Sequence, residues 1–212
     1  MTIKRITLLK RKREMTPADF RAHWAGPHAA IARNLPGLVR YNQNHVLAAS
    51  VTGPDGEWPV HGFVELWFRD RASVVEAAGS SVTRGLVIDE PKFLDGLTGL
   101  DVDASPSHGA SAQKVFVIGK PVADSAGPHT SGANLLLGIS RLEGFIDGHA
   151  DHTIGDIMRR DHLWSEPEPP QFIIWTTFSS PDTARLAFDH CQIPAAGSHR
   201  PEVYLTEEIR IV

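Results

Sequence analysis

Hydrophobic and polar residues change their spacing repeatedly along the chain, and these changes divide it into short strands and helices. Residues 3–10 alternate loosely between β-branched or apolar side chains and charged ones, which predicts a strand. Residues 38–47, 60–68 and 97–102 are three further strands by the same pattern, and residues 71–78 favour a helix. With a helix between the first two strands, the first half has the order β-α-β-β-α-β of a ferredoxin-like unit.

The helix between the first two strands has the least regular pattern in the chain. Thr16 can cap it, and Pro17 suits its first turn. One face then collects apolar residues, namely Phe20, Trp24, Ile31 and Leu35. Gly26 and Pro27 interrupt this face, although a proline inside a helix costs about 3 kcal/mol. Either the helix breaks there for a functional reason, or it kinks to follow the core.

A break near Ala25 would let Pro27 start a second short helix. It would free backbone carbonyls near His23 and allow His28 to be aimed independently of the first segment. His28 would then be available for chemistry, and the alternative is a structural histidine that holds the helix through a backbone hydrogen bond.

The strand at residues 38–47 is polar in its middle on both faces. Tyr41 and His45 point to one side, and Asn42 and Asn44 point to the other. Either one face lines a wet or ligand-filled cavity, or the strand lies at a sheet edge and faces solvent.

The strand at residues 60–68 has one clean apolar face and one mixed face. The mixed face places Glu65 between the rings of Phe63 and Trp67. Glu65 is either exposed, or partly buried with its pKa raised by desolvation.

The second half repeats the order of the first. Residues 172–178 followed by 181–187 echo the strand at residues 63–68 followed by the helix at residues 71–77, and residues 202–212 echo the last strand of the first half at residues 97–102. We therefore predict two ferredoxin-like units, at residues 1–104 and 113–212, joined by a linker at residues 105–112.

The second copy is degenerate, because nothing between His129 and His162 corresponds to Trp24 and His28. If the protein is an enzyme, its site is expected in the first half. A single ferredoxin-like unit leaves one sheet face bare, so the two units should cover each other.

Composition narrows the functional classes. The 212 residues are 42% hydrophobic and 22% charged, with a formal charge of −4, so there is no overall positive field for nucleic acid. A single cysteine, Cys191, excludes an intrachain disulfide and a multi-cysteine metal site. No apolar run is long enough for a membrane span, and the N-terminus has no signal-peptide core. We expect a soluble cytoplasmic protein with neither a nucleic-acid nor a membrane partner.

Three ordered motifs within about residues 3–102 resemble the EthD-type proteins of the dimeric α/β-barrel superfamily. They are Asp19-Phe20-Arg21-Ala22-His23-Trp24 with His28, then Leu35-Pro36-Gly37-Leu38-Val39-Arg40-Tyr41-Asn42-Gln43-Asn44-His45, and then Glu65-Leu66-Trp67-Phe68. The resemblance implies an α+β fold in which two ferredoxin-like units pack sheet to sheet as a barrel around a mostly apolar pocket. Here the second half would supply the partner within one chain, and such pseudo-dimeric chains could pair further as a homodimer.

The resemblance also implies a function class. Relatives include proteins tied to ether degradation and cofactor-independent enzymes that act on aromatic, polyketide-like or lactone compounds, while many members have no known activity. The first hypothesis is a cofactor-independent enzyme that moves protons on a small hydrophobic compound. A link to an oxidative degradation pathway stays open. The second is a non-catalytic binding or accessory protein that uses the same cavity.

The candidate site residues follow from the motifs. His28 is the first choice for general acid or base, because its ordinary pKa of about 6.5 suits proton transfer near neutrality. The candidate catalytic partners are Tyr41, His45 and Glu65, and the candidate ligand-binding residues are Trp24, His23, Phe63 and Trp67.

No cofactor or metal is expected. His23 and His28 are five residues apart, a poor spacing for one helix face, and the chain has no HExxH motif. It also lacks a GxGxxG motif after a strand and a phosphate-binding P-loop.

Overall fold

The computed structural model describes residues 2–51, 60–103, 113–119, 128–192 and 202–212. Its first unit consists of β1 (Ile3–Arg11), α1 (Pro17–His23), a π-helical turn (Trp24–His28), α2 (Ala29–Ala32), β2 (Leu38–Ser50), β3 (Gly62–Phe68), α3 (Arg71–Gly79), α4 (Ser81–Asp89), a short 3₁₀ helix (Glu90–Lys92) and β4 (Leu94–Val102). Its second unit consists of β5 (Gln113–Gly119), α5 (Pro128–Ile139), β6 (Phe145–Met158), β7 (Phe172–Phe178), α6 (Pro181–Cys191) and β8 (Glu202–Arg210). The expected linker at residues 105–112 lies outside the described residues.

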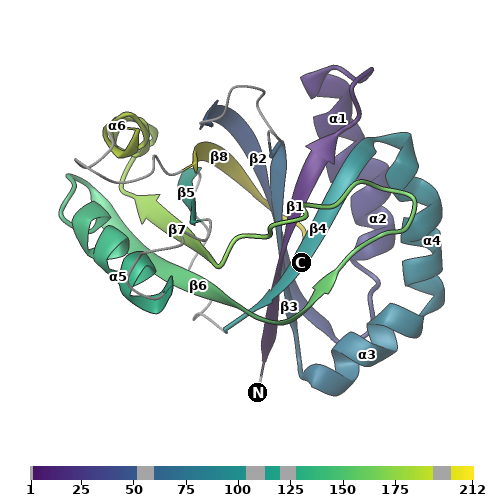
Figure 1. Ribbon diagram of the computed structural model, residues 1–212. Coiled ribbons are helices and arrows are strands. Elements are labelled where there is room, and N and C mark those ends of the chain that lie inside the picture. The colour runs from purple at the N-terminus through teal and green to yellow at the C-terminus, as the bar shows by residue number, and fades with distance from the viewer. Residues whose placement is uncertain (1, 52–59, 104–112, 120–127, 193–201) are drawn as a thin grey trace.

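The strands form one closed barrel in the order β1-β3-β2-β8-β5-β7-β6-β4 (Figure 1). Each unit contributes four adjacent antiparallel strands, and the two sheets join where β2 pairs with β8 and β4 pairs with β6. Helices α1 to α4 cover the outside of the first sheet, whereas α5 and α6 cover the second (Figure 1). The predicted α+β fold, two ferredoxin-like units packed as an intrachain barrel, is confirmed.

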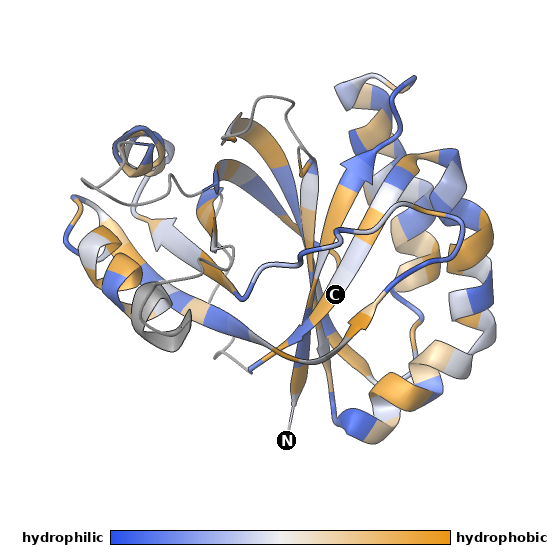
Figure 2. Ribbon diagram, viewed as in Figure 1, coloured by the Kyte–Doolittle hydropathy of each residue, from blue (hydrophilic) through white to orange (hydrophobic). Residues whose placement is uncertain are grey.

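Alternation along the strands divides the buried residues into three layers. Hydrophobic and hydrophilic residues alternate on the barrel strands in Figure 2. One apolar cluster lies between the first sheet and its helices, and a second lies between the other sheet and α5 and α6. The third cluster fills the barrel itself, where the rings of Phe63 and Phe116 stack with centroids 4.4 Å apart. Among the described helices, none is long and apolar enough to cross a membrane.

The unusual first helix widens instead of breaking. The π-helical turn Trp24–His28 is continuous with α1 and α2, and its flanking residues keep right-handed helical backbone angles. The wider turn accommodates Pro27, which has no amide hydrogen for the preceding turn. The expected break near Ala25 is therefore wrong. The Trp24 carbonyl accepts the Ala29 N–H within the turn and a second hydrogen bond from Gln43 Nε2 at 2.9 Å.

The polar strand β2 is not an edge strand. It pairs with β3 on one side and with β8 on the other. Its side chains Tyr41 and His45 face the helical layer, while Asn44 faces the barrel interior and donates to Glu65 Oε2 at 3.0 Å. Of the two interpretations of this strand, solvent exposure at an edge is wrong.

One end of the barrel interior is occupied by charged side chains from both units. Lys4 Nζ lies 3.1 Å from Glu65 Oε1 and 2.5 Å from Asp151 Oδ2. Lys114 Nζ lies 2.6 Å from Glu65 Oε2 and also pairs with Glu208. All five side chains are nearly or completely buried. We call these residues, Lys4, Glu65, Lys114, Asp151 and Glu208, the barrel ion network.

The network sets the protonation state of its central acid. Burial alone would raise the pKa of Glu65, but the ammonium groups of Lys114 and Lys4 outweigh it and hold this pKa well below its ordinary range. The predicted rise in the pKa of a buried Glu65 is therefore wrong, because two buried lysines supply the opposing positive charge.

Replacing Glu65 by Gln should destabilise the protein by about 3–5 kcal/mol at neutral pH, since it leaves two buried ammonium groups without their shared carboxylate. A depressed folded-state pKa adds stability above the unfolded value, and this stability is lost as the pH falls below about 4.3. The difference between wild type and Glu65→Gln should therefore shrink progressively in acid. Urea unfolding at several pH values measures it.

Asp189→Asn is the control, because Asp189 forms an exposed pair with Arg185 on α6. Its loss should change the stability by less than about 1 kcal/mol. Equal effects of the two substitutions, or a constant difference across pH, would contradict a buried ionised Glu65.

Candidate functional site

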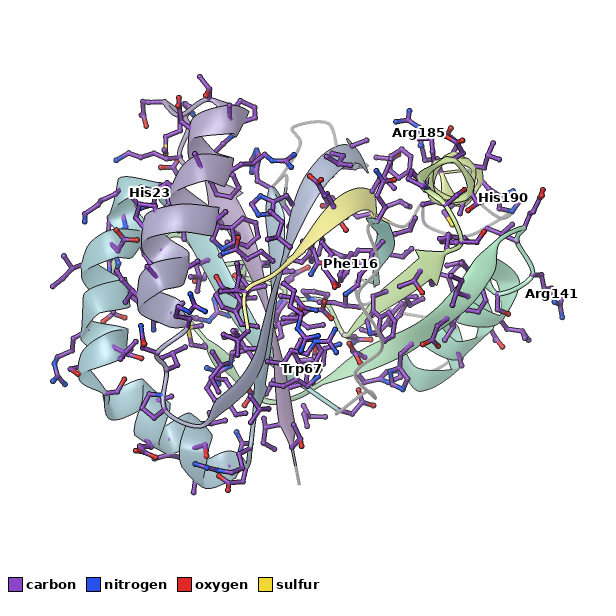
Figure 3. All side chains as sticks on the ribbon, turned by 180° about the vertical axis from the view of Figure 1, so that it is seen from behind. His23, Trp67, Phe116, Arg141, Arg185 and His190 are labelled. Atoms are coloured by element: carbon purple, nitrogen blue, oxygen red, sulfur yellow. The ribbon has the colours of Figure 1, made fainter. Side chains whose placement is uncertain are left out.

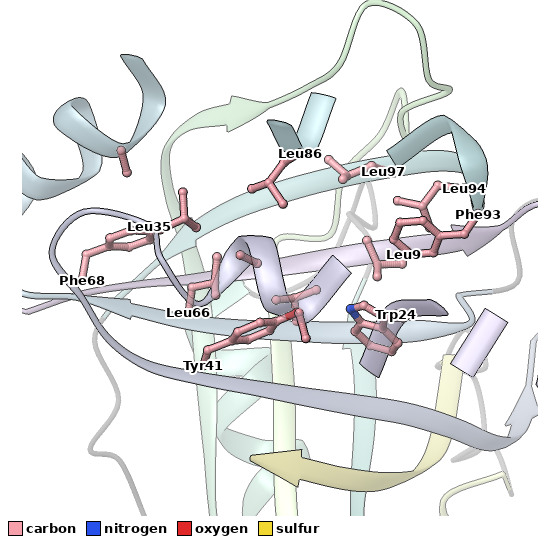
Figure 4. Close-up of a cluster of buried hydrophobic side chains, with 14 of the residues drawn as sticks. Leu9, Trp24, Leu35, Tyr41, Leu66, Phe68, Leu86, Phe93, Leu94 and Leu97 are labelled. Atoms are coloured by element: carbon pink, nitrogen blue, oxygen red, sulfur yellow. The ribbon is translucent and has the colours of Figure 1, made fainter. Parts of the chain in front are cut away.

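A cavity of about 130 Å³ lies between the first sheet and its helices. Its wall is mostly apolar, and Figure 4 shows Leu35, Leu66 and Leu86 among the side chains of this layer. His28 from the π-helical turn and Tyr41 from β2 also line it. The cavity is therefore an apolar space with a few polar groups, which is the usual composition of a small-molecule site.

Asp89, at the end of α4, fixes the orientation of His28. Its Oδ2 lies 3.1 Å from His28 Nδ1, and both side chains are buried. Since a carboxylate only accepts, Nδ1 carries the hydrogen in this pair. Among the described residues, no hydrogen bond to Nε2 of His28 occurs, and His28 is part of the cavity wall. An acid that orients a histidine in this way is the arrangement of a general base.

Burial keeps His28 neutral near pH 7. Desolvation lowers its pKa below 6.5, and this effect outweighs the opposing hydrogen bond to Asp89 and the negative charge of Glu90. A second imidazole shares the same carboxylate, because His23 Nε2 lies 3.2 Å from both Asp89 oxygens.

Tyr41 belongs to a hydrogen-bonded row on β2. Gln43 Nε2 donates to the Tyr41 hydroxyl at 2.6 Å, and Gln43 Oε1 lies 3.0 Å from His45 Nε2. Because Gln43 is the donor, the tyrosine keeps its own hydrogen for another partner. Burial raises the pKa of Tyr41, so the hydroxyl stays protonated and can donate to a ligand oxygen.

The second half of the chain completes the cavity wall. Met158 at the end of β6 and Arg160 just beyond it both line the cavity. Arg160 forms a two-pronged pair with Glu90, with Nε 2.8 Å from Oε2 and Nη2 3.1 Å from Oε1. The site is thus built from both halves, although its chemical groups come from the first.

Comparison with known proteins agrees with this architecture. The model of the EthD domain family matches residues 12–97, which include His28, Tyr41 and Asp89. These residues form an EthD domain. Among curated proteins, none matches the chain in sequence.

A solved structure shares the fold over nearly the whole chain. An anthrone oxidase-like protein is 9% identical, and the alignment covers 99% of this chain and 93% of that one with a TM-score of 0.57. An EthD family protein from Bacillus halodurans is 24% identical, and the alignment covers 50% of this chain and 100% of that one with a TM-score of 0.40.

The EthD domain does not bring all the predicted site residues together. Glu65, Phe63 and Trp67 point into the barrel, on the opposite side of the sheet from the cavity. Trp67 is labelled in Figure 3, as is Phe116 of the second unit. A strand sends alternate side chains to opposite faces, so Glu65 cannot share the face of Leu66, which lines the cavity. The expectation that His28, Tyr41 and Glu65 converge on one cavity is wrong for Glu65.

Three other predicted residues lie on the helical side of the sheet but outside the cavity wall. Trp24 packs on His45 with ring centroids 4.2 Å apart, and a Cβ on Gly62 would come within 2.4 Å of its indole. Burial lowers the pKa of His45 to about 4, so it is uncharged at neutral pH. His23 contacts Asp89 from the more exposed side of helix α1. These residues pack next to the site without lining its cavity.

The sequence patterns did not point to Asp89, Glu90 or Arg160. Asp89 ends a helix that the hydrophobic spacing did not predict, Glu90 follows it, and Arg160 lies after a strand of the degenerate half. The adjacent acids Asp89-Glu90 before Pro91 were the one available signal. No group of three or more potential metal-ligating side chains occurs within the described ranges.

Asp89→Asn should lower the pKa of His28 further, since the carboxylate opposes the effect of burial. Titration of ¹³C-labelled histidine by NMR, with the His28 resonance assigned from His28→Gln, measures the shift. Asp189→Asn should leave the resonance unchanged. If Asp89→Asn also leaves the His28 titration unchanged, Asp89 does not control this imidazole.

Proposed function

We propose that the EthD domain binds a small hydrophobic carbonyl or phenolic compound and removes a proton from it with His28, without a cofactor. The observation that carries this proposal is the Asp89–His28 pair at an apolar cavity that Tyr41 also lines. The reaction class is general-base catalysis, followed by rearrangement or oxidation of the resulting anion.

His28 has the properties of a base that works near neutrality. Asp89 holds the hydrogen on Nδ1, and Nε2 takes the substrate proton. The imidazole is neutral before the reaction, because burial lowers its pKa. Asp89 then stabilises the imidazolium that forms, as an oriented carboxylate does in other histidine bases.

Tyr41 supplies the second half of the chemistry. When a C–H bond next to a carbonyl breaks, its electron pair moves onto the carbonyl oxygen. A protonated tyrosine at that oxygen donates a hydrogen bond to the developing charge, and it does so in a site with little water. The raised pKa of Tyr41 favours hydrogen bonding over transfer of its proton.

The cavity limits the size of the substrate. An apolar cavity of about 150 Å³ in another protein holds one benzene molecule. The cavity here is similar, about 130 Å³, and mostly apolar, so a single ring or an equally small chain fits it. Small aromatic, polyketide-like and lactone compounds with an acidic hydrogen meet this description.

The fate of the anion decides between isomerisation, cyclisation, decarboxylation and oxidation. Oxidation balances without a cofactor when dioxygen is the co-substrate: a methylene group and O₂ give a ketone and water. One structural neighbour is described as an anthrone oxidase-like protein. A place in an oxidative degradation pathway, including that of ethers, is consistent with this outcome.

The protein should accelerate hydrogen–deuterium exchange at the acidic carbon of a single-ring ketone, with phenylacetone as the probe. His28→Gln should reduce this acceleration about 100-fold or more, the usual contribution of a general base. Exchange in D₂O followed by ¹H NMR measures the rate directly and requires no knowledge of the natural substrate.

His23→Gln is the matched control, because His23 contacts the same carboxylate but does not line the cavity. It should retain most of the activity. Binding of phenylacetone without faster exchange in the wild type would instead favour a non-catalytic carrier that uses the same cavity. Equal rates for His28→Gln and wild type would exclude His28 as the base.

A further inference from the structure

The second half of the chain contacts the EthD site through one segment. After β6, residues 158–166 run along β4 of the first unit, where Leu97 N–H donates to the Trp164 carbonyl at 2.8 Å. Trp164 N–H donates in turn to the Asp95 carbonyl at 3.0 Å, and Ser165 Oγ donates to the Leu97 carbonyl at 2.7 Å. The segment is thus fixed on the first unit on both sides of Leu97.

Two side chains at the start of this segment enter the cavity wall. Met158 packs against Gly99 of β4, and a Cβ at position 99 would lie 2.6 Å from the Met158 methyl carbon. Arg160 reaches Glu90 through two hydrogen bonds, and only 17% of its side chain is exposed, against 3% for Glu90. A planar guanidinium that binds both oxygens of a carboxylate fixes its direction as well as its charge.

Glu90 is the residue next to Asp89. It begins the short 3₁₀ helix that follows α4, so the backbone turn that Arg160 holds is the turn that carries the partner of His28. We propose that Arg160 is a positioning residue of the EthD site, which acts through Glu90 and Asp89 on the orientation and charge of His28. The proposal rests on the proposed function only in naming His28 as the base.

The charges around His28 give this arrangement an electrostatic consequence. Asp89 on α4 and Glu90 on the 3₁₀ helix are the acids whose charges raise its pKa, and His23 on α1 is a basic neighbour that lowers it. Lys92 balances Asp89 at 3.2 Å, and Arg160 balances Glu90. Tyr41 on β2 and Arg5 on β1 line the same cavity, and Arg5 is paired with Asp101 at 2.7 Å.

Arg160→Met would leave the Glu90 carboxylate without its counter-charge. The Glu90 carboxylate would then act on His28 as an unpaired negative charge. The pKa of His28 should rise by about one unit, the order of magnitude for one such neighbouring charge. Glu90→Gln removes the acid and leaves the arginine, so it should lower this pKa. The double variant should return close to the wild-type value.

NMR titration of ¹³C-labelled histidine in the full chain tests all three variants without any ligand. Arg159→Met is the matched control, because the neighbouring Arg159 is exposed and contacts the Glu166 carbonyl instead. Its His28 titration should equal that of the wild type. If Arg160→Met does not fold, Glu90→Gln alone decides, with a lowered pKa as the expected result.

The proposal would be overturned if the pKa of His28 is the same in Arg160→Met, Glu90→Gln and Arg159→Met. That result would leave the proposed function standing, because phenylacetone exchange in the wild type tests it separately. Conversely, absent exchange with the expected titration shifts would refute the base chemistry and keep Arg160 as the residue that sets the charge of His28.

Discussion

The closed barrel depends on oppositely charged side chains that meet inside it. Lys4 and Glu65 come from the first unit, and Lys114, Asp151 and Glu208 come from the second. Taking such charges out of water costs several kcal/mol for each ion, and only close pairing offsets this cost. An alignment of the two sheets that separated these pairs would leave their charges buried without a partner. The barrel ion network therefore determines which surfaces can pair more than it adds to the total stability.

This constraint explains why the candidate site lies outside the barrel. Ion pairs occupy the charged end of the barrel interior. Apolar side chains such as Phe63 and Phe116 fill the rest of the interior. The outer face of the first sheet is free of this requirement. There the π-helical turn brings His28 to the cavity, and the end of α4 brings Asp89 to His28. Structural charge and candidate catalytic charge thus occupy opposite faces of one four-stranded sheet.

The sequence predicted the fold better than the site, for physical reasons. Strand alternation in β3 and the repeat of strand and helix in the second half are local patterns, so they revealed the two units. The same alternation placed Glu65 on the face opposite Leu66, but it could not show which face held the cavity. That answer depends on Lys114, which lies far away in the sequence and closes the barrel around Glu65.

Other misses have the same origin. Pro27 was interpreted with the energetics of a regular α-helix, whereas a wider turn admits it without a break. Asp89 pairs with His28 across 61 residues, and Arg160 pairs with Glu90 across 70, so no spacing rule connects either pair. Long-range pairing of buried charges is decided by tertiary structure, and only the candidate base itself carried a local signal.

The two sheets of the barrel belong to one polypeptide, and this has a consequence for how the site behaves on dilution. In a barrel made from two separate chains, a wall contributed by the partner exists only above the dissociation constant of the dimer. Here Met158 and Arg160 remain tethered to the EthD domain, at an effective concentration that dilution does not change. The site is therefore complete in a single molecule, even at vanishing protein concentration, and each half is free to vary without preserving a two-fold symmetric interface.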